Sequence, residues 1–537
     1  MSEWDSIIVG AGSAGCVLAN RLSAESRRRV LLLEAGGRDW SPYIHMPAAI
    51  IRAIGNPKLD WRYQAEPDPS RNDRVDLWPA GRVLGGSSAI NGMLYVRGRP
   101  GDYDRWASAG CPGWSGAEVW PVFKRIEDTA LGDDAVRGRG GPMSTRPLRS
   151  THPLAHVFVG AAEEQGIPRN TDYNSGEQHG VAYSEVTQKR GWRFSAARGY
   201  LRPAMKRANL TVMTHSPVES LEFEGSRCVG VTVRRRDGST KTLRARREVI
   251  LSAGALATPG VLLRSGIGPA KTLRSLGITP RVDAPELGRN LQEHPEGMVG
   301  IDVNVSTYNT EINSWKIVLH AMNWLLRGRG PATSPYPHAV GFFKTDPALA
   351  EPDVEVQLGP YAFTFTEDGV VPYPKPAVSA AVSPCYPESR GRLRWSSPDQ
   401  LLRPRIEHQL LADDADVARL IAGCRLVRRI FESPVFDAYR VAERLPGSAV
   451  QTDDEWLDYL RQAAFLGYHP VGTCRMGSDD RAVVDPQLNV RGVTGLRVAD
   501  ASIMPTLTSG NTHAPVMMIG ERCAELVLAD QETRNDH

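Results

Sequence analysis

The feature that most constrains this chain is a glycine-rich turn near its N-terminus. An apolar run at residues 7–9 is followed directly by Gly10, Gly12 and Gly15, and apolar residues then recur at helical spacing. This pattern predicts a strand, a tight turn and a helix. Gly10 permits the turn, Gly12 lets backbone N–H groups approach a phosphate, and Gly15 allows the helix to pack closely on the strand.

A second apolar run and an acidic residue complete this unit. Residues 30–33 are followed by Glu34, which lies 19 residues after Gly15. A dinucleotide-binding βαβ unit has its ribose-binding acidic residue at this distance, and its helix N-terminus supplies partial positive charge to the phosphates. On these residues alone the ligand can be NAD, NADP or FAD. Glu34 disfavours only the 2′-phosphate of NADP and does not distinguish NAD from FAD. A purely structural glycine loop is the alternative.

The length and charge of the chain set outer limits. Its 537 residues exceed what one hydrophobic core usually supports, so we expect two domains of unequal size. The 64 basic and 61 acidic residues nearly balance and form no long block of one sign. Nothing in this balance therefore argues for a nucleic-acid partner or for an acidic membrane surface.

Cysteine usage and hydropathy indicate the cellular compartment. The seven cysteines are scattered and never form a CxxC pair, which favours a reducing compartment and predicts no structural metal. The first strand begins by Asp5, which leaves no room for a signal peptide, and the longest apolar runs are too short to span a bilayer. We therefore expect a cytoplasmic protein without membrane insertion.

Two longer segments resemble a known family. Gly81 to Gly98 contains paired glycines and serines before Asn91 and an apolar run, and Gly254 to Pro269 follows a predicted strand. Together they resemble the two signature segments of the glucose-methanol-choline (GMC) oxidoreductases, which are FAD enzymes. The resemblance extends from Asp5 to about Leu528.

The resemblance implies two domains of different class. A Rossmann-like FAD-binding domain of α/β class is expected to span residues 1–152, 206–295 and 465–537. A discontinuous, sheet-based substrate-binding domain of α+β class is expected to span residues 153–205 and 296–464.

The glycine turn and the resemblance together imply the residues that bind the cofactor. Some family members attach FAD covalently through a His just before Asn91, but this chain has Ile90 there, so we expect non-covalent FAD. The implied cofactor-binding residues are Gly10, Gly12, Ser13, Ala14, Gly15, Glu34, Ala35, Trp61, Val83, Asn91, Gly92, Met93, Leu94, Val218, Tyr468, Asp500, Ala501 and Thr512.

Two histidines near the C-terminus are the predicted catalytic residues. His469 is followed 44 residues later by His513, and in the family the residues at these positions face the flavin. The resemblance implies hydride transfer from an alcohol carbon to flavin N5, with neutral His469 as the base that takes the hydroxyl proton. His513 would orient the substrate oxygen, and the two roles are partly exchangeable. The spacing around these histidines is not that of a zinc site.

Three further positions have more than one interpretation. His294, in the segment that leads to the second domain, is expected to be a structural hinge residue rather than a base. Gly467 either leaves room beside the flavin or serves a backbone turn. Cys385 is expected to be a buried thiol, although one branch of the family uses a Cys beside its substrate.

Aromatic residues are frequent between positions 331 and 376. Tyr361, Phe363 and Phe365 alternate as on one face of a strand, and each either belongs to the core or walls an apolar pocket. No carboxylate with an aromatic cage for a quaternary ammonium group can be assigned in this segment. Choline therefore ranks below aryl alcohols as the expected substrate.

The predicted activity is FAD-dependent oxidation of a primary alcohol, aryl or furanic, to the aldehyde, with electrons passed to O2 to give H2O2. The chain is similar to hydroxymethylfurfural-type and aryl-alcohol oxidases and to bacterial choline and alcohol dehydrogenases. One alternative is a choline or aliphatic-alcohol dehydrogenase that uses a quinone or another carrier. Others are a hydroxynitrile lyase on the same fold and a flavin-binding protein without catalysis, which the histidine pair disfavours.

Overall fold

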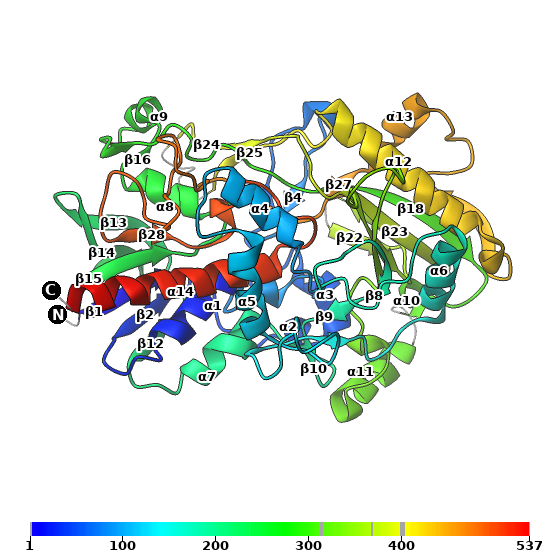
Figure 1. The fold of residues 1–537 in the computed structure, drawn as a ribbon, viewed down its shortest axis with the longest axis horizontal. Coiled ribbons are helices and arrows are strands. Elements are labelled where there is room, and N and C mark those ends of the chain that lie inside the picture. The colour runs from blue at the N-terminus through cyan, green and yellow to red at the C-terminus, as the bar shows by residue number, and fades with distance from the viewer. Residues whose placement is uncertain (1–2, 236, 312–314, 367–368, 398–402, 536–537) are drawn as a thin grey trace.

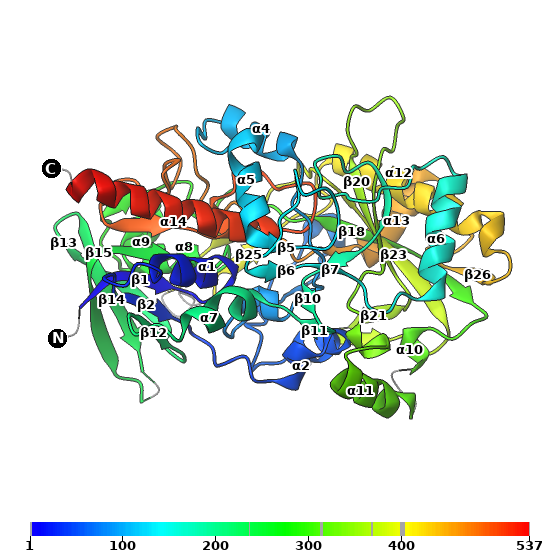
Figure 2. The same cartoon turned by 60° about the horizontal axis from the view of Figure 1, so that its bottom comes forward.

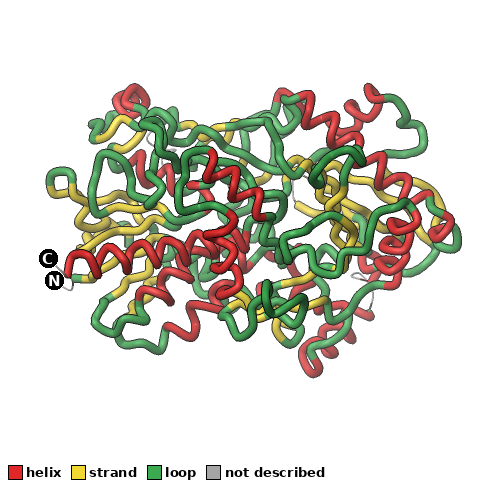
Figure 3. The backbone as a smooth tube through the Cα atoms, in the orientation of Figure 1, coloured by secondary structure: helices red, strands yellow, loops and turns green. Residues whose placement is uncertain are grey.

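Two β-sheets toward opposite ends of an elongated molecule form the framework of the fold (Figures 1 and 3). Both ends of the chain lie at the end of the molecule that holds the first sheet (Figures 1 and 2). The computed structural model describes residues 3–235, 237–311, 315–366, 369–397 and 403–535.

The first sheet contains the predicted strand, turn, helix and strand. Its strands run in the order β12-β2-β1-β15-β14-β13, and β28 pairs with β15. β1 pairs in parallel with β2 and β15, which places Ile8 opposite Leu32 and Ile250, all fully buried. The strand bounds are β1 Trp4–Val9, β2 Val30–Leu33, β12 Leu210–Met213, β13 Val218–Glu224, β14 Arg227–Arg234, β15 Thr240–Leu251 and β28 Leu496–Val498.

The second sheet is antiparallel, in the order β19-β20-β23-β18-β26, and β27 pairs with β18. Helix α12 (Asp414–Glu432) packs on it so closely that a Cβ atom added to Gly423 would lie 2.7 Å from Cγ1 of Val382. The predicted domain boundaries, which divide the chain between the two sheets, stay a prediction. The strand bounds are β18 Pro295–Val303, β19 Ala339–Phe343, β20 Val354–Gly359, β23 Ala377–Pro384, β26 Arg440–Leu445 and β27 Phe465–Leu466.

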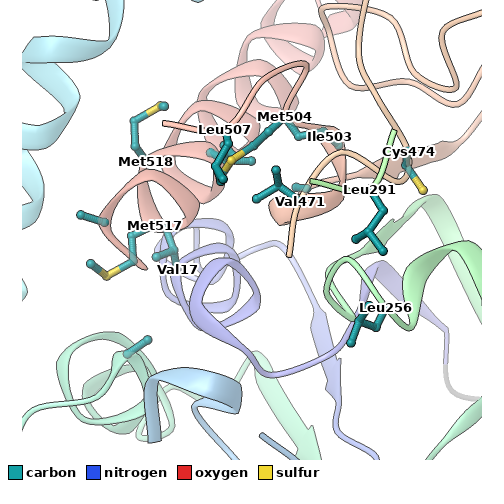
Figure 4. Close-up of a cluster of buried hydrophobic side chains, with 14 of the residues drawn as sticks. Val17, Leu256, Leu291, Val471, Cys474, Ile503, Met504, Leu507, Met517 and Met518 are labelled. Carbon is teal, nitrogen blue, oxygen red and sulfur yellow. The ribbon is translucent and has the colours of Figure 1, made fainter. Parts of the chain in front are cut away.

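Helices α1 and α14 pack together along the first sheet, although they come from opposite ends of the chain. A Cβ atom added to Gly520 would lie 3.0 Å from Cα of Ala14 and 3.0 Å from Cβ of Val17, so the helix backbones approach closely. Val17 and Met517 are buried near one another between the two helices (Figure 4). The remaining helix bounds are α1 Ser13–Leu22, α2 Pro42–His45, α3 Ile50–Ala53, α4 Pro100–Ser108, α5 Gly116–Ile126, α6 Pro153–Glu164, α7 Arg202–Ala204, α8 Thr258–Arg264, α9 Ala270–Ser275, α10 Tyr308–Glu311, α11 Lys316–Arg327, α13 Asp453–Ala463 and α14 His513–Asn535.

Short strands and single helical turns connect these elements. The short strands are β3 Tyr63–Gln64, β4 Leu77–Trp78, β5 Glu127–Asp128, β6 Met143–Ser144, β7 Arg146–Pro147, β8 Gly180–Tyr183, β9 Glu185–Val186, β10 Gln188–Lys189, β11 Trp192–Arg193, β16 Ile267–Gly268, β17 Val282–Asp283, β21 Phe363–Thr366, β22 Gly369–Pro372, β24 Arg392–Arg394 and β25 Arg405–Glu407. Single turns used below are η1 Pro47–Ala49, η5 Pro331–Thr333 and η8 Ala501–Ile503.

In the described part of the chain, no helix has the length and apolar character needed to cross a bilayer. Within the same residues, no three His, Cys, Asp or Glu side chains come together in a group that could hold a metal ion.

The glycine turn depends on close backbone contacts. Gly10 adopts φ +102°, a backbone conformation that L side chains rarely adopt, and a Cβ atom there would lie 2.4 Å from the carbonyl oxygen of Ser252. A Cβ atom on Gly15 would lie 1.9 Å from the carbonyl oxygen of Gly10. Helix α1 can therefore lie this close to the end of β1 only because Gly15 has no side chain.

Gly15→Ala should lower the free energy of unfolding by about 1–3 kcal/mol, because the added methyl group forces α1 away from the turn. Gly160→Ala is the matched control, since Gly160 lies in α6 with no atom within 4 Å of the added Cβ. The control should be neutral or more stable by about 0.5–1 kcal/mol. Denaturant unfolding of both variants measures the difference, and equal stabilities would contradict the packing argument.

Candidate active site

A cavity of about 400 Å³ lies between the two sheets. The ends of β2 and β15 reach it through Glu34 and Ser252, and β18 and β20 of the second sheet contribute Glu296 and Gln357. Ligands of open α/β sheets bind beyond the carboxyl ends of the parallel strands, and the cavity occupies this position.

All predicted cofactor-binding residues except Gly15 and Val83 line this cavity, as do both predicted catalytic histidines. Gly15 acts through the close packing described above. The side chain of Val83 is fully buried in a hydrophobic cluster with Ile44, Leu59 and Ile90, and of these four only Ile90 also lines the cavity. Burial among other aliphatic side chains is favourable. A contact of Val83 with the cofactor stays a prediction.

At one end of the cavity the structure fits a dinucleotide. Glu34 accepts hydrogen bonds from the backbone N–H groups of Ala11 at 3.0 Å and Gly36 at 2.7 Å, and burial raises the pKa of its carboxyl to about 7. Gly12 caps α1 without any side-chain hydrogen bond, and the first turn has no acidic residue. The free N–H groups of this helix N-terminus therefore suit a phosphate group.

Asp500 connects two segments that line the cavity, the second signature segment and η8. It follows β28 and accepts hydrogen bonds from the Gly254 N–H at 2.9 Å, the Thr258 hydroxyl at 2.6 Å and the Ser502 N–H at 2.8 Å. Gly254 and Thr258 belong to the second signature segment, and Ser502 belongs to η8. The carboxylate thus holds Ala501 and the signature segment against the same cavity.

At the other end of the cavity, His469 belongs to a chain of hydrogen bonds. Its Nδ1 atom lies 2.9 Å from Nδ1 of His294, whose Nε2 atom lies 3.2 Å from the carbonyl oxygen of Cys385. Its Nε2 atom lies 3.0 Å from the side-chain nitrogen of Asn511. All three side chains are largely buried, and His469 and Asn511 line the cavity.

These contacts determine which nitrogen of His469 carries its proton. The Cys385 carbonyl only accepts, so Nε2 of His294 is protonated and its Nδ1 atom is an acceptor when the ring is neutral. Nδ1 of His469 must then donate to it. The lone pair of His469 is consequently on Nε2, where the Asn511 amide donates to it at the cavity wall.

Burial keeps both imidazoles neutral. It lowers the pKa of His294 to about 4, and burial together with the neighbouring His294 lowers the pKa of His469 well below its ordinary value. Glu293 fixes the backbone here, since its carboxyl accepts from the His469 N–H at 2.7 and 2.9 Å. The preceding Tyr468 has φ +63°, a strained conformation that this anchoring helps to maintain.

His513 lines the cavity from the start of α14. Its Nδ1 atom lies 2.9 Å from the hydroxyl of Ser13, at the start of α1. Its Nε2 atom is buried and has no hydrogen-bond partner among the described residues. Burial, and secondarily the charge of Arg193, lowers the pKa of His513 to about 4. A second neutral imidazole nitrogen is thus available to a ligand in the cavity.

The structure shows the contacts of the three positions that had more than one interpretation. His294 is the direct hydrogen-bond partner of His469. Its predicted role as a structural hinge residue stays a prediction. A Cβ atom on Gly467 would lie 3.0 Å from Nδ1 of His469 and 3.0 Å from Cβ of His294, so this glycine leaves room for their hydrogen bond. The thiol of Cys385 is fully buried in a hydrophobic cluster with Phe342, and the residue meets the histidine chain only through its carbonyl group.

Aromatic side chains and one carboxylate wall the cavity beside the histidines. Tyr361 and Phe363 line it with Tyr336 and Phe465, and the rings of Tyr336 and Tyr361 lie 5.4 Å apart. The side chain of Phe365, predicted to alternate with them, lies outside the described residues.

Glu296 is the residue that the sequence analysis missed. It is buried in the cavity wall, and burial, with the nearby Glu355 and Glu293, raises its pKa well above the ordinary range. The prediction about a carboxylate concerned residues 331–376 alone, and Glu296 lies outside that segment. An acidic residue inside the apolar strand 295–299 was the available signal, but only the folded sheet brings Glu296 to Tyr336 and Phe465.

Comparison with known proteins identifies the family. The family model described as GMC oxidoreductase matches residues 4–296 with its N-terminal part and residues 387–520 with its C-terminal part. An oxygen-dependent choline dehydrogenase of Rhizobium etli is 39% identical over 533 residues, which cover 98% of this chain and 96% of the relative. An alcohol dehydrogenase [acceptor] of Pseudomonas putida is 39% identical over 534 residues, with the same coverage of both chains.

A solved structure agrees with these relatives. The crystal structure of pyridoxine 4-oxidase from Mesorbium loti has a TM-score of 0.88 and 34% identity, covering 97% of this chain and 99% of that chain. The two matched segments cover the first sheet and both predicted catalytic histidines, while strands β19, β20 and β23 of the second sheet lie between them. The chain therefore belongs to the GMC oxidoreductase family and is an FAD-dependent enzyme that oxidises alcohols.

Proposed function

We propose that this enzyme oxidises a primary alcohol with an aryl or furanic body to the aldehyde and passes the electrons to O2, giving H2O2. The observation that supports this most is the lone pair of His469 Nε2, which faces a cavity walled by aromatic side chains. FAD, when bound, accepts the hydride from the alcohol carbon. Two names support oxygen as the acceptor. The choline dehydrogenase relative is called "oxygen-dependent", and the solved structure is that of an oxidase.

The residues of the cavity suit proton removal from a hydroxyl group. An alcohol that replaces the Asn511 amide at His469 Nε2 donates its proton there. The resulting imidazolium still donates through Nδ1 to His294, so its positive charge is stabilised inside the protein. We assign the task of holding the substrate oxygen to Nε2 of His513, which has no partner among the described residues.

The cofactor is proposed to be non-covalent. Ile90 lines the cavity at the position where some relatives use a His for attachment, and its side chain cannot form such a bond. The holoenzyme should then release intact FAD on denaturation.

Glu296 supports a second candidate, the oxidation of an alcohol that carries a cationic group, such as choline. A carboxylate surrounded by aromatic rings is a recognised arrangement for quaternary ammonium groups. A bound cation would offset the desolvation that keeps the Glu296 carboxyl protonated. The name of the Rhizobium etli relative agrees with this candidate.

His469→Ala should slow flavin reduction by an alcohol about a thousandfold, because the base is lost. FAD should stay bound. The assay adds benzylic alcohols to the holoenzyme without oxygen, follows bleaching of the flavin, then admits air and measures peroxide. His156→Ala, an exposed histidine of α6, is the control and should behave as the wild type. Loss of FAD from His469→Ala would make its role structural, and a wild type that no alcohol bleaches would favour the lyase.

The rate of flavin reduction should be independent of pH from about pH 6 to about pH 8, since the pKa of His469 is lowered well below its ordinary value. A lowered pKa keeps the imidazole neutral at every pH above it, so no loss of base is expected in this window. Stopped-flow measurement of anaerobic reduction across this range checks the expectation. A decline on the acidic side with an apparent pKa of about 6.5 or higher would contradict it.

Glu296→Gln distinguishes the two candidate substrates, because the amide keeps the shape of the side chain but cannot ionise when a cation binds. If the aryl-alcohol proposal holds, the wild type should oxidise benzylic alcohols faster than choline. The kcat/KM of the variant for benzylic alcohols should stay within about threefold of the wild-type value. Choline oxidation should fall by about tenfold or more, as expected when a cation loses its counter-charge. A wild type that prefers choline by more than about tenfold would replace the first candidate with the second.

A further inference from the structure

Helix α11 exposes a stripe of large apolar side chains that no described part of the chain covers. Their exposed fractions are 50–75%. They recur every three or four residues and therefore lie along one side of the helix. The stripe, called here the α11 apolar stripe, consists of Trp315, just before the helix, and Val318, Leu319, Met322, Leu325 and Leu326.

The opposite side of α11 is firmly attached to the protein. Trp324 is buried, donates a hydrogen bond from its Nε1 atom to the carbonyl oxygen of Gly191 at 2.8 Å, and has its ring centroid 4.1 Å from that of Trp192. Gly328, in a left-handed conformation, ends the helix against Arg190. The apolar stripe is thus held outward by an anchored helix.

Positive charges gather at the C-terminal end of the stripe. Arg327 and Arg329 are exposed at the end of the helix and just after it, and the exposed Arg190 adjoins this end. At the start of the helix, Lys316 forms an ion pair with Glu311 at 3.5 Å. Between residues 315 and 345 the chain has no acidic residue. The surface therefore combines apolar and basic side chains.

The charges and the size of the stripe select among possible occupants. A second copy related by two-fold symmetry would bring the same basic residues together. The 12 residues of α11 form a helix only about 18 Å long, too small for the roughly 800 Å² per partner that a stable interface buries. An anionic lipid surface instead complements both features, since apolar side chains enter it and Lys and Arg contact its headgroups.

We propose that α11 lies in the surface of an anionic membrane, parallel to it, as a docking helix. Contacts between neighbouring elements connect α11 to the wall of the cavity. η5 follows α11 and contacts η1, which leads into α3, and Ile50 and Ile51 of α3 line the cavity. Both views show α2 and α11 on the same side of the molecule (Figures 1 and 2). Docking would bring this wall of the cavity close to the lipid.

Vesicle sedimentation of the holoenzyme tests the proposal. The probes are phosphatidylcholine vesicles with about one-quarter phosphatidylglycerol, and vesicles of phosphatidylcholine alone. The enzyme should bind the anionic vesicles, bind the neutral ones at least about tenfold more weakly, and lose much of its binding between about 0.05 M and about 0.5 M salt.

Two pairs of substitutions separate the apolar and basic contributions. Leu325→Ser with Leu326→Ser, and separately Arg327→Glu with Arg329→Glu, should each raise the lipid concentration for half-binding about tenfold or more. Val441→Ser removes an exposed apolar side chain from β26 and should bind as the wild type. All variants should retain FAD and oxidise the alcohol in lipid-free buffer, which shows that they are folded.

Two results would overturn the proposal. One is that the wild type does not bind anionic vesicles, or that the variant with the Leu325 and Leu326 substitutions binds them as well as the wild type does. The other is a lipid-free dimer, seen by analytical ultracentrifugation, that the same substitutions dissociate, since the stripe would then cover a second copy. Neither result depends on the substrate, so the proposed function is tested separately.

Discussion

The hydrogen bond between the Nδ1 atoms of His294 and His469 is the interaction on which the proposed chemistry depends. Two neutral imidazole nitrogens can share only one proton, and the Cys385 carbonyl assigns that proton to His469. The second sheet brings the residues together, because β18 and β27 pair antiparallel and the Gly467 N–H donates to the His294 carbonyl at 2.9 Å. The sheet that walls the substrate cavity therefore also orients the base.

The glycine turn and His513, one of the two predicted catalytic histidines, are joined at the contact between α1 and α14. Ser13 begins α1 directly after the glycine turn, and its hydroxyl meets His513 at the start of α14. Close packing at Gly520 holds the two helices in this register. A side chain that displaced α1 would thus disturb both the phosphate-binding turn and the orientation of His513, although these residues are 500 positions apart in the sequence.

Local patterns made much of this arrangement predictable. β1, α1 and β2 are encoded by residues within one short segment, and the predicted histidines lie in the same cavity as the predicted cofactor residues. The missed features depend on pairing between distant segments. His294 and Glu296 reach their partners only when β18 pairs with β27 and β23. The side chain of Val83 packs in a hydrophobic cluster that the signature motif alone does not reveal.

The central claim is that His469 presents an unprotonated Nε2 atom to the cavity, and 15N NMR of histidine-labelled holoenzyme tests it most directly. The signals of His469 are assigned by their loss in His469→Gln. The account predicts a protonated Nδ1 and an unprotonated Nε2 between about pH 6 and about pH 8. A proton on Nε2 in this range, whether from the other tautomer or from an imidazolium, would contradict it.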